Sequence, residues 1–241
     1  MLKISLILGA LAALADVVGG AVLVRAHGIE RYLRYFVALG AGFLMATAIV
    51  EMAPESLKIS PSMGPVLIML GYCAVHLLEH TINAHFHFGE ETHSDEFVSQ
   101  RTSYSVLAGL SVHALFDGVA IGSGFVVSNW LGWLIFLAIL LHKAPEGFTM
   151  ASIMLASGRS RSTAFISSVA LAAATLVGVA VIELAPHLLV IGMPVSAGVA
   201  IYVAATDLVP EVNREPGIRM ALIFFAGVGA FLLLRHLLPA L

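Results

Sequence analysis

Residues 131–155 read LGWLIFLAILLHKAPEGFTMASIML, an apolar run that carries His142 and Glu146 near its middle. A helix needs about 20 predominantly apolar residues to cross the hydrocarbon core of a bilayer, so this run is long enough to span a membrane. A second run over 106–125, VLAGLSVHALFDGVAIGSGF, also carries a histidine and a carboxylate. Because ionisable groups are costly at membrane depth, the two runs predict spanning helices that hold a functional site.

The composition of the whole chain predicts an all-α polytopic membrane protein with a single transmembrane domain over residues 1–241. Of its 241 residues 59% are hydrophobic and 11% are charged, and the mean hydropathy is +0.98. Soluble domains contain about 25% charged residues. A net charge of -3 gives no reason to expect nucleic acid, and a single cysteine, Cys73, excludes an intrachain disulfide. We expect eight helices, at 4–24, 34–54, 64–84, 104–126, 131–155, 163–185, 192–210 and 218–238.

The distribution of Lys and Arg predicts the orientation in a plasma or inner membrane. Eight of these residues follow the odd-numbered helices, three lie on the other side, and Lys143 is inside a helix. The positive-inside rule then places both termini outside, and the histidine-containing loop 85–103 in the cytoplasm. The first 20 residues resemble a signal peptide, but Asp16 and an apolar run that continues through Val24 favour a retained helix.

Four residues of the two central runs form a candidate metal site. His113 and Asp117 are four residues apart, as are His142 and Glu146, so each pair shares one face of its helix. Both histidines fall near the bilayer centre, and the short connection makes the two helices antiparallel neighbours. Imidazole and carboxylate ligands suit zinc, iron(II) or manganese(II). The alternative is that each buried group only satisfies a neighbour, which matched pairs at matched depth disfavour.

An inverted repeat of helices 1–3 and 6–8 around helices 4 and 5 is also predicted, a 3+2+3 arrangement. The second expected helix ends in Pro54-Glu55 and the seventh in Pro210-Glu211, at opposite faces of the membrane. Repeats of this kind flank midplane binding sites in many carriers.

The motifs HALFDGVAIG and HKAPEG resemble the helix-4 and helix-5 signatures of the ZIP (Zrt/Irt-like) metal transporter family. The stretches GAGFLMATAIVEMAPES and AGVAIYVAATDLVPE are similar to its helices 2 and 7, and a histidine-bearing loop between helices 3 and 4 is a further likeness. The resemblance implies eight helices, uptake of divalent metal into the cytoplasm, a homodimer, and an elevator-like movement of the site-bearing helices.

The sequence departs from the family where many relatives bind a second metal. The corresponding positions hold Ala114, Lys143 and Thr175, and the helix-2 methionine ligand of the family is replaced by Leu44, beside Met45. A protonated lysine cannot ligate a metal. We therefore expect one metal ion, with the Lys143 ammonium in the place of the second.

Other polar residues are candidates for the two ends of an ion path. Asp16 and Asp207 could also line it. Glu51, Glu55 and Glu183 would form an outer entrance, whereas an inner exit would comprise His76, Glu79, His80, His85, His87, His93 and Glu211. Snorkelling or helix-end positions are the alternative explanation for the two aspartates and the three entrance glutamates. The H-x-x-E-H run formed by His76, Glu79 and His80 also occurs as an inverted zinc-protease motif, which would need its own structural context.

These observations favour a transporter of divalent transition metals, with zinc first and iron, manganese or cadmium as alternatives. A rival hypothesis is an intramembrane metallohydrolase, which would need a general base and a metal-bound water. No carboxylate is as clearly placed for that role, and the HExxH motif of zinc proteases is absent from the sequence. A metal sensor without transport is a third alternative, which the inverted repeat disfavours.

Overall fold

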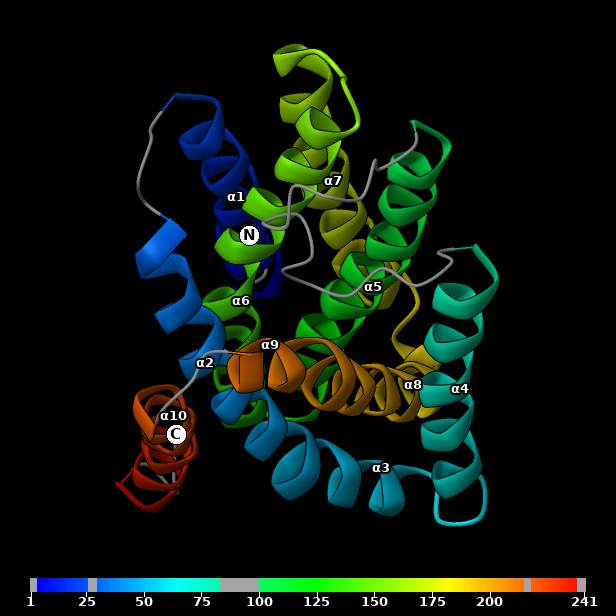
Figure 1. Ribbon diagram of the computed structural model, residues 1–241. Helices are drawn as coiled ribbons and strands as arrows, with labels where there is room; N and C mark the ends of the chain where they lie inside the picture. The colour runs from blue at the N-terminus through cyan, green and yellow to red at the C-terminus, as the bar shows by residue number, and fades with distance from the viewer. Residues whose placement is uncertain (1–3, 26–29, 83–99, 215–217, 238–241) are drawn as a thin grey trace.

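The computed structural model describes residues 4–25, 30–82, 100–214 and 218–237, and within them every regular element is a helix (Figure 1). The first half of the chain contains α1 (Ile4–Arg25), α2 (Glu30–Thr47), the π-helical segment η1 (Ala48–Met52), α3 (Ala53–Ile59) and α4 (Gly64–Ile82). The central pair is α5 (Gln100–Val127) and α6 (Asn129–Ala156). The last part contains α7 (Arg161–Leu184), η3 (Pro186–Leu188), α8 (Leu189–Tyr202), the π-helical η4 (Val203–Leu208), α9 (Val209–Arg214) and α10 (Ile218–Leu237).

Seven helical stretches of the described residues are long and apolar enough to cross a membrane, and the apolar helix Gly64–Glu79 is a shorter eighth. All eight coincide with the expected spans. Several boundaries differ from the expectation: α5 begins at Gln100, inside the predicted loop, the second span continues to Ile59, and the seventh begins at Pro186. The expected second span ends at its proline, Pro54. The helix nevertheless continues, because a proline is tolerated within the first turn of α3.

Two serines cap the beginnings of helices, and one glycine lies in a connection, where the sequence predicts breaks. The Ser128 hydroxyl accepts a hydrogen bond from the Leu131 N–H at the start of α6. In the same way, Ser160 caps α7 through the Thr163 N–H. Between them Gly158 takes a φ of 78°, a left-handed conformation that side-chain-bearing residues rarely adopt. These caps fix the short α5–α6 and α6–α7 connections and so make the three helices neighbours.

The helices form two groups that differ in their packing partners. In the first group α6 packs on α1, α5 packs on α7, and α1 also packs along α7. In the second group α2 packs on α10, and α4 packs on α8. The groups meet where α2 contacts α6 and where α8 contacts α5. Figure 1 shows α1, α5, α6 and α7 together, with α3, α8 and α9 across one end of them.

Glycines bring the helices of each group into backbone contact. A Cβ built on one of these glycines would lie about 2 Å from a carbonyl oxygen of the partner helix, closer than any side chain permits. The contacts are reciprocal, because each helix supplies a glycine to the other: Gly19 and Gly147 between α1 and α6, Gly118 and Gly178 between α5 and α7, Gly42 and Gly227 between α2 and α10, and Gly71 and Gly198 between α4 and α8. All four reciprocal pairs lie within a group.

Two π-helical segments interrupt the second and seventh spans at corresponding places. In η1 the Ala53 N–H donates to the Ala48 carbonyl, and in η4 the Val209 N–H donates to the Ala204 carbonyl, each five residues back. A proline, which has no N–H to donate, lies two positions after the last residue of each segment, at Pro54 and Pro210. The segments also pack reciprocally, η1 against α8 and η4 against α2. The wider turn is therefore a shared feature of the two spans.

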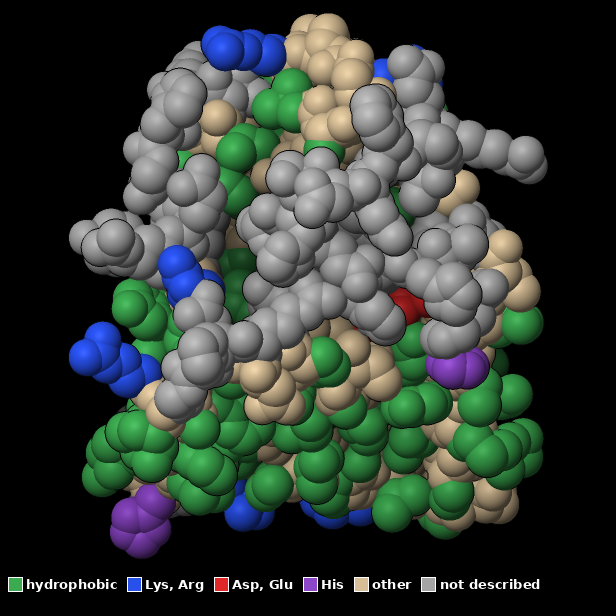
Figure 2. All heavy atoms as spheres, in the orientation of Figure 1, with side chains coloured by type: hydrophobic (Ala, Val, Ile, Leu, Met, Phe, Trp, Pro, Cys, Tyr) green, Lys and Arg blue, Asp and Glu red, His purple; other side chains and the backbone are tan. Residues whose placement is uncertain are grey.

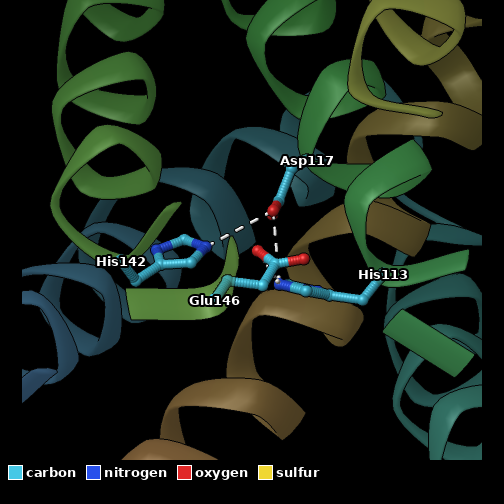
Figure 3. A group of neighbouring side chains, drawn as sticks. All are labelled: His113, Asp117, His142 and Glu146. Atoms are coloured by element: carbon cyan, nitrogen blue, oxygen red, sulfur yellow. Dashed lines mark hydrogen bonds and ion pairs between the residues drawn. The ribbon is translucent and has the colours of Figure 1, made fainter. Parts of the chain in front are cut away.

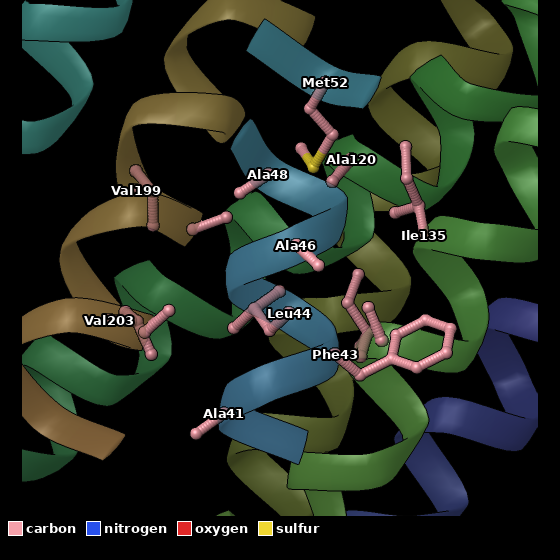
Figure 4. Packing of buried hydrophobic residues seen from close by; sticks show 14 of the residues in the cluster. Ala41, Phe43, Leu44, Ala46, Ala48, Met52, Ala120, Ile135, Val199 and Val203 are labelled. Atoms are coloured by element: carbon pink, nitrogen blue, oxygen red, sulfur yellow. The ribbon is translucent and has the colours of Figure 1, made fainter. Parts of the chain in front are cut away.

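An apolar core fills the space between the two groups. Figure 4 shows Phe43, Leu44 and Met52 of the second span beside Ile135 of α6 and Val203 of η4. On one outer face, hydrophobic side chains gather over α3, α8 and α10 (Figure 2). Exposed leucines and phenylalanines such as Leu222 and Phe225 lie on α10. An apolar exterior of this kind suits a chain that is surrounded by lipid.

Candidate metal site

Helices α5 and α6 bring His113, Asp117, His142 and Glu146 together at one point (Figure 3). One ligand atom from each residue lies within 4.8 Å of the others, and all four residues are buried. His113 Nε2 is 3.2 Å and His142 Nε2 is 3.3 Å from the same oxygen, Asp117 Oδ2. Glu146 Oε2 is 3.8 Å from His113 Nε2. The spacing of the two pairs therefore places four potential ligands, two imidazoles and two carboxylates, in one cluster.

The separations between these atoms match those in a metal coordination sphere. Zinc binds histidine nitrogen and carboxylate oxygen at about 2.0–2.2 Å in a tetrahedral arrangement, so its ligand atoms lie roughly 3.3–3.6 Å apart. Two histidine–aspartate distances fall within or beside that range, and the glutamate oxygen is only slightly farther away. The cluster can accept a small divalent cation with little rearrangement.

The His142 ring is oriented by its own helix. Its Nδ1 lies 2.9 Å from the Ala138 carbonyl oxygen, one turn earlier in α6, and an Nδ1–H donates there. That bond leaves Nε2 as the lone-pair atom that faces the cluster, which is the usual arrangement of a metal-binding histidine. His113 differs, because its Nδ1 has no hydrogen-bond partner among the described residues.

Lys143 lies inside the cluster, as the sequence predicts for the residue in the second metal position. Its side chain is fully buried, and Nζ is 2.8 Å from Asp117 Oδ2 and 2.7 Å from Glu146 Oε2. These are the two carboxylate oxygens that face the histidines. The ammonium thus binds the same atoms that a metal ion would use.

Asp16 of α1 also belongs to this cluster. The sequence alone predicts for it only a position along an ion path. It is completely buried, and its Oδ2 lies 3.7 Å from Lys143 Nζ. Its backbone carbonyl packs directly on Gly147, the residue after Glu146. A buried aspartate in an apolar first helix is a signal of function, but nothing in the sequence names its partner.

The other two second-site positions offer no ligand. Ala114 is buried in an apolar cluster with residues of α6 and α7, such as Met150 and Leu171. The Thr175 hydroxyl donates to the Leu171 carbonyl of its own helix. The thioether position is also filled, because Leu44 is packed in the apolar core.

The predicted entrance residues each have a protein partner. Glu51 forms an ion pair with Arg235 of α10, at 2.7 Å between Oε1 and Nε. Glu55 binds Lys58 on its own helix. Glu183 accepts a hydrogen bond from the hydroxyl of Ser5 on α1. Glu51 and Glu183 therefore connect different helices, whereas Glu55 pairs within its own, and among the described residues the three do not form a metal-binding group.

Two of the predicted exit residues meet a tyrosine that the sequence reading did not single out. The Tyr202 hydroxyl donates to Glu79 Oε2 at 2.8 Å, and the rings of Tyr202 and His76 lie 5.9 Å apart. Asp207 on η4, five residues after Tyr202, is also buried, and it accepts a hydrogen bond from the Thr206 hydroxyl. The predictions for His85, His87 and His93 fall outside the described residues, as do the side chains of His80 and Glu211.

Comparison with known proteins gives one family and several zinc transporters. The family model described as ZIP Zinc transporter matches residues 89–235. Zinc transporter ZIP9 of Micropogonias undulatus is 31% identical over 160 residues, 61% of this chain and 51% of that protein. Zinc transporter SLC39A7 of Rattus norvegicus is 32% identical over 163 residues, 61% of this chain and 34% of that protein. The chain spans about half the length of the ZIP9 relatives it matches.

Proposed function

Because this chain belongs to the ZIP zinc transporter family, we propose that it carries divalent transition metal ions, zinc foremost, across a membrane. Iron(II), manganese(II) and cadmium fit the same donor set. The ion would be held by His113, Asp117, His142 and Glu146. The observation that carries the proposal is the convergence of these four ligand atoms within 4.8 Å, at full burial, in helices that can span a bilayer.

We propose one metal ion in each chain. Lys143 Nζ already contacts both carboxylates that would bridge a second ion, and Ala114 and Thr175 supply no ligand beside it. A fixed positive charge within about 3 Å of the bridging oxygens repels a second divalent cation strongly in a low-dielectric interior.

Transport would follow an elevator-like alternating access, in which α1, α5, α6 and α7 move together against the second group. The reciprocal glycine contacts support this division, because they bind helices within each group. Glycine contacts between the groups are less close: a Cβ on Gly40 of α2 would lie 3.4 Å from Leu141 of α6, and one on Gly192 of α8 would lie 3.0 Å from the Val119 side chain of α5. A polar contact also joins the groups, a hydrogen bond from the Ser196 hydroxyl of α8 to the Phe116 carbonyl of α5. An interface of apolar side chains can slide more readily than one with backbones locked together.

An inverted repeat, α1 to α4 against α7 to α10, is supported by corresponding features. The pairing of α1 with α6 matches that of α7 with α5, and the pairing of α2 with α10 matches that of α8 with α4. The segments η1 and η4 occupy equivalent places, each before a Pro-Glu. Carriers with such repeats expose one site alternately to the two sides.

We propose inward transport, with both termini outside and loop 85–103 in the cytoplasm. The excess of Lys and Arg after the odd-numbered helices supports this orientation. Glu51, Glu55 and Glu183 would line the outer approach, and Glu79 with His76 the inner one. We also propose a homodimer of single-domain chains, as in the family, with part of the apolar exterior as the contact.

The alternative is an intramembrane metallohydrolase that uses the same site. It would require a general base beside a metal-bound water. The nearest additional carboxylate is Asp16, and the Lys143 ammonium lies 3.7 Å from it. A carboxylate beside a positive charge is a weaker base toward a metal-bound water, which favours transport.

Metal flux tests the proposal directly. The purified full chain is reconstituted in sealed liposomes that contain a zinc-sensitive dye, and zinc or cadmium is added outside. We expect saturable flux that His113→Ala removes. Metal binding without flux would indicate a sensor, and cleavage of a membrane substrate without flux would indicate a hydrolase. Labelling of loop 85–103 from outside intact cells would contradict the orientation and the inward direction.

A further inference from the structure

Lys143 and a metal ion compete for the same oxygens. Nζ is 2.8 Å from Asp117 Oδ2 and 2.7 Å from Glu146 Oε2, and those oxygens face His113 and His142. An ion bound between the two histidines would approach both oxygens at about 2.0–2.2 Å. The ammonium and the metal cannot share these positions at full contact because both are cations. The ammonium must withdraw from at least one of the carboxylates when the ion binds.

Asp16 is placed to receive it. The carboxylate oxygen Oδ2 is 3.7 Å from Nζ, the next carboxylate contact of the ammonium after the two ligands. Neither Asp16 oxygen has a hydrogen-bond partner among the described residues, although the side chain is fully buried. Buried carboxylates almost always have their hydrogen bonds satisfied. The two Asp16 oxygens, without hydrogen bonds, are therefore an exception among buried carboxylates.

The position of Asp16 is fixed by the close contact of α1 with α6. A Cβ on Gly147 would lie 2.0 Å from the Asp16 carbonyl oxygen, and one on Gly19 would lie 2.0 Å from the Ala144 carbonyl oxygen. The backbones around Lys143 and Asp16 are thus held together on both sides of the ion pair. A small rotation of the flexible lysine side chain, without helix movement, closes the gap from 3.7 Å to a hydrogen bond.

The charges of the cluster also require a third carboxylate. Asp117 and Glu146 contribute two negative charges and Lys143 one positive charge, which leaves minus one for a divalent ion. With Asp16 the cluster holds three negative charges and one positive, a net of minus two. One divalent cation then makes the buried cluster neutral, which a low-dielectric interior favours.

We propose that Asp16 is the acceptor to which the Lys143 ammonium moves when a divalent cation binds. We also propose that the negative charge of Asp16 lets the cluster balance the charge of one such ion. The inference rests on the proposed function, because it presumes that His113, Asp117, His142 and Glu146 bind metal. Asp16 is a positioning residue: it acts through Lys143 and does not itself contact the ion.

Metal affinity of charge variants tests this role. The full chain is purified in detergent, and its dissociation constants for Zn²⁺ and Cd²⁺ are measured by competition with a fluorescent chelator. Asp16→Asn keeps the shape but leaves the ammonium without a negatively charged acceptor, so we expect affinity to fall at least about tenfold, because a buried charge deprived of its partner is strongly unfavourable. The double variant Asp16→Asn with Lys143→Gln restores a net charge of minus two, and its affinity should return to within about threefold of the original.

Controls separate this role from a structural one. Ser168→Ala removes a hydrogen bond to the Gly147 carbonyl at the same helix junction without a change of charge, and should leave affinity within about twofold. Original affinity in Asp16→Asn, with His142→Ala unable to bind, would overturn the transfer of the ammonium and leave the metal site standing. Weakened binding that the double variant does not rescue would also overturn it, since Asp16 would then be structural. Absence of saturable binding in the unmodified chain would overturn the proposed function, and this inference with it.

Discussion

The two helix groups bury different kinds of side chain. The first group, α1 with α5, α6 and α7, encloses the charged cluster and most of the buried hydroxyls. Of the described residues in the second group, only Thr47, Ser56, Ser196 and Asp207 are buried polar side chains. The surface between the groups is formed mainly by apolar residues such as Leu44, Ile135 and Val203. The difference teaches that the cluster of buried charges belongs to one group, whereas the other supplies a largely apolar surface; in the proposed transport cycle the first group would move against that surface.

Removal of a ligand should have the largest effect. His142→Ala or Glu146→Ala leaves a metal ion without a donor in a place where water cannot fully replace it. We expect loss of saturable zinc or cadmium uptake, measured in cells at equal surface expression. His236→Ala, at an exposed position on α10 of the second group, should retain full uptake. Full uptake by both ligand variants would remove the functional distinction between the groups.

Glycine substitutions separate effects on helix packing from effects on metal binding. Gly147→Ala in the first group and Gly198→Ala in the second would each place a Cβ within about 2 Å of a carbonyl oxygen, so both should lower the free energy of unfolding by about 1–3 kcal/mol or more. Only Gly147→Ala should also weaken metal binding, because it displaces Asp16 and Glu146. Thermal unfolding in detergent measures the first effect and chelator competition the second.

Gly229→Ala is the matched control, since nothing lies within 4 Å of its Cβ position. It should be neutral in both measurements. A loss of metal affinity in Gly198→Ala equal to that in Gly147→Ala would mean that the site depends on both groups alike.

We expect the charge of Lys143 to limit the number of metal ions that the first group binds. Lys143→Asp replaces a cation with a ligand, so the first group should then hold a second metal ion, more so together with Ala114→Asn. Metal stoichiometry or anomalous scattering counts the ions in each chain. Two ions in the unmodified protein, both contacting Asp117 and Glu146, would contradict this role of Lys143 and leave the family assignment unchanged.

The smallest effect is expected in the second group. Tyr202→Phe removes the hydrogen bond to Glu79 between α8 and α4 and should cost about 0.5–1.5 kcal/mol of stability. Metal affinity at the cluster should not change. A parallel loss of affinity would show that the two groups are coupled energetically through this bond.

The sequence predicts the helices and the clustering of the four candidate ligands well, because both depend on local spacing. Apolar length gives the spans, and a separation of four residues puts His113 with Asp117 and His142 with Glu146 on single helix faces. The pairing of Lys143 with Asp16 joins residues 127 positions apart, and no periodicity encodes such a contact. The same holds for Tyr202 and Glu79, which are 123 positions apart. The sequence also does not predict the π-helical segments, because their apolar residues have the pattern of an ordinary helix.

The segments η1 and η4 change the phase of the helices that contain them. A π-helical turn holds one residue more than the regular repeat, so every side chain that follows is rotated by about 100° around the axis. The faces of α3 and α9 are therefore rotated away from the directions that a regular continuation of α2 and α8 would give them. Each of these two spans consists of two half-helices with separately set faces. An insertion or deletion of one residue within η1 or η4 would change the relation between the halves and leave each half intact.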